Sequence, residues 1–314
     1  MGMIEDEKLF DVAIAYHVRK KTQKEIAQEY NVSHVQISKY LKLAEQRGII
    51  TISVNPPSVT KEDLQWYQIM FKELFGLKNL VLTPGANNTE KSHALLVSFA
   101  AKYITETYDN TSLNIGLGLG RTIHDLCKFT NEMTKKSKWT YYPVCTSIHN
   151  KSSRYFDYEQ LLRMIAENWG GEYSSKFNNM LYFSESLDVD FRKSICDYLS
   201  NLDILITGIG SAFTLNPATR EMFFSQEEQS EILTTNLVGD MVNFFFDIDG
   251  NIYAPHNKIK NQLTLEQLRA TPLRIAVASG FHKVESIVGA LRAELVQTLI
   301  TDMPTAKHVI EYMK

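Results

Sequence analysis

Cysteine and long apolar runs are the two things this 314-residue sequence has little of. Its three cysteines, Cys127, Cys145 and Cys196, lie far apart and show no CxxC or Cys/His spacing, which argues against a zinc site or a disulfide framework. We expect reduced, buried thiols. No run of 18 apolar residues occurs and no signal-peptide pattern opens the chain, so we expect a soluble, cytoplasmic protein that does not span a membrane.

Catalytic and metal-binding motifs are also missing. The sequence has no GxSxG elbow and no HExxH helix, and its eight histidines are scattered. No pair of acidic residues has roles that the spacing fixes. We therefore predict no catalytic residue, no metal site and no cofactor.

Charge is divided unevenly along the chain. The whole sequence has a formal charge of −3, but residues 17–60 carry seven Lys or Arg against three Asp or Glu. Residues 61–314 carry 25 against 29. A mildly basic head on an acidic body suits a DNA-binding protein, although the contrast is modest. The length and the 44% hydrophobic content favour two domains, which we place at 1–57 and 58–314.

Residues 22–48 read as two short helices joined by a tight turn. Thr22 and Glu25 form a capping box at the start of a helix that ends near Tyr30, and Asn31 tolerates the left-handed turn that follows. Ser33 caps a second helix over 34–46. We expect its apolar residues to share the inward face, namely Val35, Ile37, Leu41 and Ala44.

The opposite face of this second helix carries amide, hydroxyl and ammonium groups, which read base edges and phosphates in a major groove. An earlier helix over 5–18 and a wing strand over 49–54 would complete a winged helix-turn-helix. The alternative is a helical hairpin with a solvated polar face. The candidate DNA-binding residues are Thr22, Gln23, Ser33, His34, Val35, Gln36, Ser38, Lys39 and Lys42.

From residue 61 onward the pattern is that of an α/β domain. A helix over 61–75 has an apolar stripe that either packs on the body or pairs with a second subunit. Short apolar runs then alternate with amphipathic segments, which predicts a mainly parallel sheet covered on both faces. We expect strands at 80–82, 113–117, 140–144, 204–209, 275–278 and 298–301, and an added hairpin strand in 241–250. We expect helices at 90–108, 122–129, 158–169, 191–199, 283–292 and 304–312.

Glycine-rich segments follow two of these strands. Gly116, Gly118 and Gly120 lead into Arg121 and Thr122 at the start of a helix, where bare backbone amides and the helix N-terminus favour an anion. The spacing matches neither the dinucleotide fingerprint nor the Walker loop, so a plain tight turn is the alternative. A second such loop contains Gly208 and Gly210.

Charged residues follow two further segments. Asp240 and Asp247 are carboxylates that could accept hydrogen bonds from sugar hydroxyls, and Lys283 could bind a phosphate or a hydroxyl. For Asp247 the alternative is a turn residue, and for Lys283 it is a surface lysine. Because ligands bind beyond the carboxyl ends of strands in open α/β sheets, we expect these groups to gather there.

Taken together, these blocks resemble the SorC family of sugar-responsive transcriptional regulators. The head matches in residues 9–16, 22–27 and 32–49, and the body in Gly116–Thr122, Gly208–Ser211, Val238–Gly250 and Ala278–Leu291. The resemblance implies a winged helix-turn-helix joined to a Rossmann-like effector domain related to sugar-phosphate isomerases. It also implies a homo-oligomer, dimer or tetramer, and effector contacts from Gly118, Gly120, Arg121, Thr122, Asp240 and Lys283.

Two segments depart from the family pattern, at residues 142–149 and 178–183, and both would line the sugar pocket. The helix-turn-helix pattern, the glycine-rich strand ends and the family resemblance together lead us to interpret the chain as a regulator of a carbohydrate-utilisation operon. It would bind double-stranded operator DNA with an affinity set by a sugar or sugar phosphate. The alternatives are a sugar-phosphate isomerase or deaminase with an accessory DNA-binding head, and a DNA-binding head on a purely structural body.

Overall fold

The computed structural model describes residues 6–50, 59–86, 88–108, 112–129, 137–145, 157–173, 197–211, 226–227, 230, 236–253 and 263–314. The chain divides into two compact units, Met1–Pro56 and Pro57–Lys314. Each unit has a hydrophobic core of its own.

The N-terminal unit is a cluster of short helices, as predicted. They are α1 (Asp6–Ala13), the π-helix η1 (Ile14–Val18), α2 (Gln23–Glu29) and α3 (His34–Gln46). The single helix predicted over 5–18 therefore widens into a π-helical turn at its end. The fully buried side chains that hold the helices together include Leu9, Val12, Ile26, Ile37 and Ala44. Most of the predicted wing strand lies outside the described residues.

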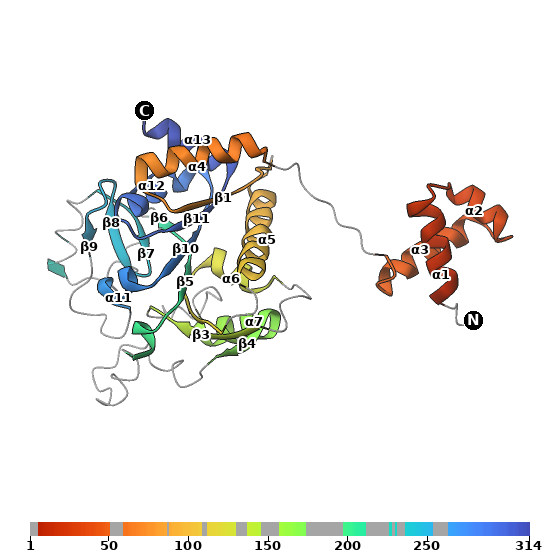
Figure 1. Ribbon diagram of the computed structural model, residues 1–314, viewed down its shortest axis with the longest axis horizontal. Helices are drawn as coiled ribbons and strands as arrows, with labels where there is room; N and C mark the ends of the chain where they lie inside the picture. The colour runs from red at the N-terminus through yellow and green to blue at the C-terminus, as the bar shows by residue number, and fades with distance from the viewer. Residues whose placement is uncertain are drawn as a thin grey trace. The chain divides into compact units, whose positions relative to one another are not determined.

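The C-terminal unit is built around a seven-stranded sheet in which every neighbouring pair is parallel (Figure 1). The spatial order is β1-β11-β10-β5-β2-β3-β4. The strands are β1 (Asn79–Thr83), β2 (Asn114–Leu117), β3 (Ser137–Pro143), β4 (Gly170–Tyr173), β5 (Ile204–Thr207), β10 (Leu273–Val277) and β11 (Thr298–Asp302). The central strands β5 and β10 are almost completely buried, as parallel strands covered on both faces must be.

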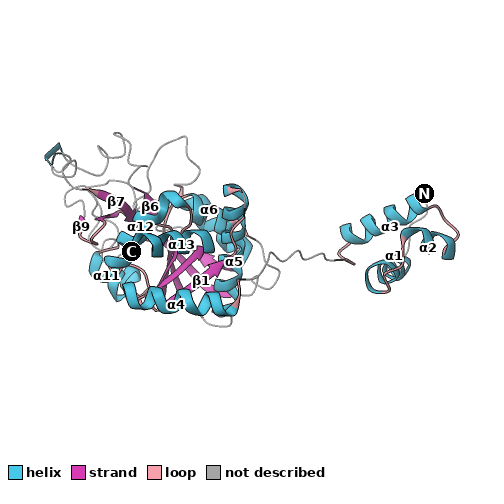
Figure 2. Ribbon diagram, turned by 90° about the horizontal axis from the view of Figure 1, so that it is seen from above, coloured by secondary structure: helices cyan, strands magenta, loops and turns pink. Residues whose placement is uncertain are grey.

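Helices cover both faces of this sheet (Figures 1 and 2). One face carries α5 (Thr89–Thr107), α6 (Arg121–Cys127) and α7 (Tyr158–Trp169). The other carries α4 (Lys61–Phe75), α12 (Val284–Arg292) and α13 (Met303–Tyr312), with α11 (Leu265–Ala270) just before β10. The sequence predicted the larger of these helices to within a residue or two. It missed α11, and the described part of the helix expected over 191–199 begins only at 197.

The chain forms a separate, small antiparallel sheet after β5 and before it returns to the large sheet at β10. Its order is β6 (Gly210–Ser211), β7 (Leu237–Met241), β8 (Phe244–Asp247) and β9 (Ile252–Tyr253). The hairpin strand expected in 241–250 is present as β8 and ends in a turn, but it begins only at Phe244 because Met241 belongs to β7. Val242 and Asn243 both have positive φ, 53° and 62°, and form the two-residue turn of a β7–β8 hairpin.

The strand predicted over 204–209 is also shorter than expected. It ends at Thr207, and Gly208–Ile209 form the loop that carries the chain from the large sheet into β6. This loop lies at the centre of the large sheet, because β5 is the middle strand.

Candidate functional site

The exposed face of α3 carries most of the candidate DNA-binding side chains. His34, Ser38, Lys39 and Lys42 are exposed, and Gln36 is half-buried. Val35 is 52% exposed, so the prediction that it faces inward is wrong. Tyr40 is buried at 8% exposure and fills the inner face beside Ile37 and Leu41, which leaves Val35 on the outer face.

Side-chain caps fix where α2 and α3 begin. The Thr22 hydroxyl accepts from the Glu25 backbone amide at 3.3 Å, and the Glu25 carboxylate accepts from the Thr22 amide at 2.7 Å, which is the predicted capping box. The Ser33 hydroxyl accepts from the Gln36 amide at 3.2 Å. Asn31 has a φ of 51° and makes the left-handed turn between the helices. The two helices are thereby held as a helix-turn-helix.

The C-terminal unit places its glycine-rich loops at one point of the sheet. From β2 the chain moves outward through α6 to β3, whereas from β5 it moves the other way, through β10 and α12 to β11. The carboxyl ends of β2 and β5, which pair with each other, therefore flank the point at which the winding direction reverses. Open α/β sheets bind their ligands at such a point.

The glycines permit close contacts between these loops. A Cβ on Gly118 would lie 2.2 Å from the Thr207 hydroxyl, and one on Gly210 would lie 1.8 Å from a carboxylate oxygen of Asp240. A Cβ on Gly208 would come no closer than 3.8 Å to the backbone of Val277, with the Thr122 side chain at 4.0 Å. The loops after β2, β5 and β10 therefore form one surface. Gly116 packs deeper, where a Cβ would meet apolar side chains.

Two opposite charges lie at this surface. The Lys283 ammonium donates to the backbone carbonyl of Ile209 at 2.8 Å. Burial raises the pKa of the Asp240 carboxyl to about 6, and attraction to Lys283 opposes that rise. Burial also lowers the pKa of Lys283, and Asp240 opposes this shift. Lys283 is half-buried and hydrogen-bonded to a neighbouring loop, so it is not the freely exposed surface lysine that was its alternative.

Two predicted residues are engaged in other contacts. The Arg121 guanidinium pairs with Asp125, one turn further along α6, at 3.9 Å, and Gly120 caps this helix with a φ of 123°. The Asp247 carboxylate accepts from the backbone amides of Asp249 and Asn251, at 3.0 and 2.9 Å. These are the hydrogen bonds of the turn residue that was its alternative. Asp247 also lies at the opposite end of the β7–β8 hairpin from Asp240.

Sequence reasoning missed a polar support beneath the loops. The fully buried Tyr158 hydroxyl donates to the Leu117 carbonyl at 2.7 Å and accepts from the Cys145 amide at 3.3 Å, which ties the ends of β2 and β3 together. Burial raises the pKa of the Cys145 thiol to about 12, although its hydrogen bonds with Tyr158 and with the Leu119 backbone oppose the rise. Both residues looked like ordinary core positions, so the sequence held no signal for this role.

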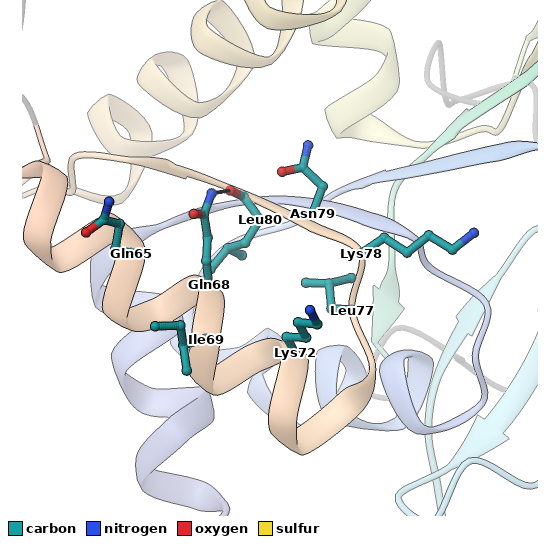
Figure 3. Close-up of a pocket in the computed structure, with 8 residues that line it drawn as sticks. All are labelled: Gln65, Gln68, Ile69, Lys72, Leu77, Lys78, Asn79 and Leu80. Carbon is teal, nitrogen blue, oxygen red and sulfur yellow. Dashed lines mark hydrogen bonds between the residues drawn. The ribbon is translucent and has the colours of Figure 1, made fainter.

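A separate hollow of about 430 Å³ lies on the other side of the domain, between α4 and the edge strand β1 (Figure 3). It is lined by Gln65, Gln68, Ile69, Lys72, Leu77, Lys78, Asn79 and Leu80. The Gln68 amide donates to the Leu80 carbonyl at 3.1 Å and so satisfies one backbone group of the strand edge. None of the predicted effector residues belongs to it.

Comparison with known proteins agrees with this architecture. A family model described as "Putative sugar-binding domain" matches residues 60–311. The sorbitol operon regulator of Klebsiella pneumoniae is 25% identical over 307 residues, covering 96% of both chains. The deoxyribonucleoside regulator of Bacillus subtilis is 24% identical over 310 residues, again with 96% of both chains covered. The crystal structure of the full-length Klebsiella regulator matches 98% of this chain with a TM-score of 0.70 at 22% identity.

A helical N-terminal unit and an α/β body with a sugar-binding family match, together with relatives that are regulators, define a sugar-responsive transcriptional regulator, not an enzyme. The named relatives are regulators, which decides against the isomerase or deaminase alternative. The chain belongs to the SorC family of sugar-binding transcriptional regulators. Among the described residues, no helix has the length and apolar character needed to cross a bilayer.

Proposed function

We propose that this regulator binds the operator of a carbohydrate-utilisation operon through α3 and senses a sugar or sugar phosphate at the carboxyl ends of β2, β5 and β10. The close approach of Gly118 to Thr207 and of Gly210 to Asp240, and the hydrogen bond from Lys283 to the Ile209 carbonyl, support the effector half. Backbone amides at the start of α6 and the Lys283 ammonium supply positive potential for a phosphate, and Asp240 supplies an acceptor for hydroxyl groups. Such a protein works in the cytoplasm, where its operator is.

The effector acts without reacting. A ligand that binds one arrangement of the protein more tightly shifts the population toward that arrangement and changes operator affinity by the same coupling energy. The relatives' names point to polyols and deoxyribose-type sugars, so the effector of this chain belongs to the same broad carbohydrate class.

A thermal-shift screen of the full chain against sugar phosphates, free sugars and polyols tests this site. A ligand of the folded state stabilises it by about 2.7 kcal/mol at a hundredfold excess over its Kd. We expect at least one phosphorylated sugar to raise the melting temperature, and Lys283→Ala to abolish the shift. A shift that survives in Lys283→Ala would place the ligand elsewhere, with the hollow beside α4 as the next candidate.

We also propose a homo-oligomer that uses the outer face of α4. Tyr67 and Phe71 of this helix are buried against the body, which the first reading of its apolar stripe predicted. A second face exposes Trp66 and Ile69, which are three residues apart and 49% and 56% exposed. Ile69 also lines the hollow in Figure 3. A second copy would cover both side chains. Sedimentation should show smaller particles for Trp66→Ser/Ile69→Ser than for the control Lys102→Ala, and equal sizes would rule out this face.

A further inference from the structure

Val35 is an exposed apolar side chain in the middle of a polar surface. It is 52% exposed, although a core position was expected for it. Ser38, Lys39 and Lys42 follow it by three, four and seven residues, so all four share one face of α3. Single exposed apolar residues are common on protein surfaces, so the exposure alone means little. The position of Val35 in α3 is what suggests a role for this side chain in DNA recognition.

That position is the second residue of α3, two residues after the Ser33 cap. In helix-turn-helix proteins the N-terminal residues of the second helix approach base edges, while more distal basic residues contact phosphates. Val35 gains nothing for the fold at this place, because it reaches no core and a β-branched residue is a weaker helix former than alanine. Its χ1 angle is nevertheless restricted in a helix, so its methyl groups are already held in place before binding.

Only one base presents an apolar group in the major groove, namely thymine with its 5-methyl group. We propose that Val35 is a specificity-determining residue that packs on the 5-methyl group of one thymine in each operator half-site. Lys39 and Lys42, further along the same face, lie where phosphate contacts would fix the register of the helix. This inference rests on the proposed placement of α3 on operator DNA.

Deoxyuridine supplies the test, because it differs from thymidine only by this methyl group. Operator duplexes are first selected from a random pool with the full-length protein, and each thymine is then replaced by uracil in turn. Affinities are measured by fluorescence anisotropy at one fixed salt concentration. We expect one replacement per half-site to weaken wild-type binding about fourfold, which is the worth of one buried methyl group, about 0.8 kcal/mol.

The variant Val35→Ala should bind the thymine operator more weakly than the wild type and show no further loss with uracil at that position. Alanine favours the helix, so the variant should fold. Val18→Ala is the matched control, since Val18 is 71% exposed in the same unit and follows α1, not α3. It should keep the full uracil penalty.

Two results would overturn the inference. One is a wild type that tolerates uracil at every thymine, and the other is a Val35→Ala variant that retains the same thymine-to-uracil ratio. Lys39→Ala separates these outcomes from failure of the proposed DNA contact. If Lys39→Ala weakens binding while uracil has no effect, only the role of Val35 is lost. If α3 variants leave DNA affinity unchanged, the proposed DNA-binding face itself is wrong.

Discussion

In the N-terminal unit all candidate DNA contacts come from residues 22–42, whereas in the C-terminal unit the candidate effector contacts extend from Gly116 to Lys283. The first set lies mostly on the exposed face of one helix, α3, and two caps support the helix starts. The second is a junction of loops in which a lysine and a carboxylate are half-buried and glycines allow the loops to touch. Substitutions on the exposed face of α3 should therefore change DNA affinity without changing the free energy of unfolding. Substitutions in the loop junction of the body should change both stability and effector affinity.

The largest effect should come from the basic residues of α3. Each lysine that loses a charge-assisted contact to phosphate should cost about 1.5–3 kcal/mol of binding free energy. The double variant Lys39→Ala/Lys42→Ala should also lower the slope of log affinity against log salt by about 2. Its melting temperature should match the wild type. An unchanged salt slope would remove both lysines from the interface, and Lys102→Ala in the body serves as the control.

A glycine pair tests the opposite behaviour in the body. Gly118→Ala places a Cβ 2.2 Å from the Thr207 hydroxyl and 3.3 Å from the Thr207 backbone, so it should reduce the free energy of unfolding by about 1–3 kcal/mol. Gly208→Ala is the matched control, because nothing approaches within 3.8 Å of its Cβ. Denaturant unfolding distinguishes them. Equal stability of the two variants would show that the loops are not in tight contact.

Ser33, the N-cap of α3, is a position in the N-terminal unit at which a substitution should change stability. Ser33→Ala removes the acceptor for the Gln36 amide and should destabilise the N-terminal unit by about 1 kcal/mol. Ser38→Ala, on the exposed face of the same helix, should leave stability nearly unchanged. The comparison is measured by the helical circular dichroism of each variant during thermal unfolding. Equal midpoints for the two serine variants would mean that the cap contributes nothing.

The smallest effect concerns pH and the half-buried carboxyl of Asp240. Its folded-state pKa of about 6 lies above the ordinary value of 3.8, so the folded state retains a proton that the unfolded chain loses between these values. The contribution of Asp240 to the free energy of unfolding therefore falls as pH rises from about 4 to 6. Asp240→Asn has no carboxyl group to ionise, so its stability relative to the wild type should increase between about pH 4 and 6 and then level off. If the difference in stability between Asp240→Asn and the wild type does not vary with pH, the raised pKa of Asp240 is contradicted.

Local signals explain why so much of the head could be predicted. The pair Thr22 and Glu25, the cap Ser33 and the turn residue Asn31 each act within a few residues, and all were found as expected. Val35 was misplaced because helical spacing alone does not decide between two neighbouring positions at the edge of an apolar face. The buried Tyr40 took the inward place.

The body could be predicted as a class and in its main elements, but not as a site. The glycine loops and Lys283 were recognisable because strand ends and helix starts have sequence signals. The contact of Gly210 with Asp240 and the support of Leu117 by Tyr158 depend on sheet order, which no local pattern encodes. The short β4, β6 and β9 were missed for the same reason, since their pairing partners define them.

Operator affinity with and without effector tests the central claim most directly. The ligand giving the largest thermal shift is added at a hundredfold excess over its Kd, and operator binding is measured for the wild type and for Lys283→Ala. We predict a change of about fivefold or more in the operator Kd of the wild type. Lys283→Ala should match the ligand-free wild type and not respond. A ligand that stabilises the wild type yet leaves its operator Kd unchanged would contradict the account.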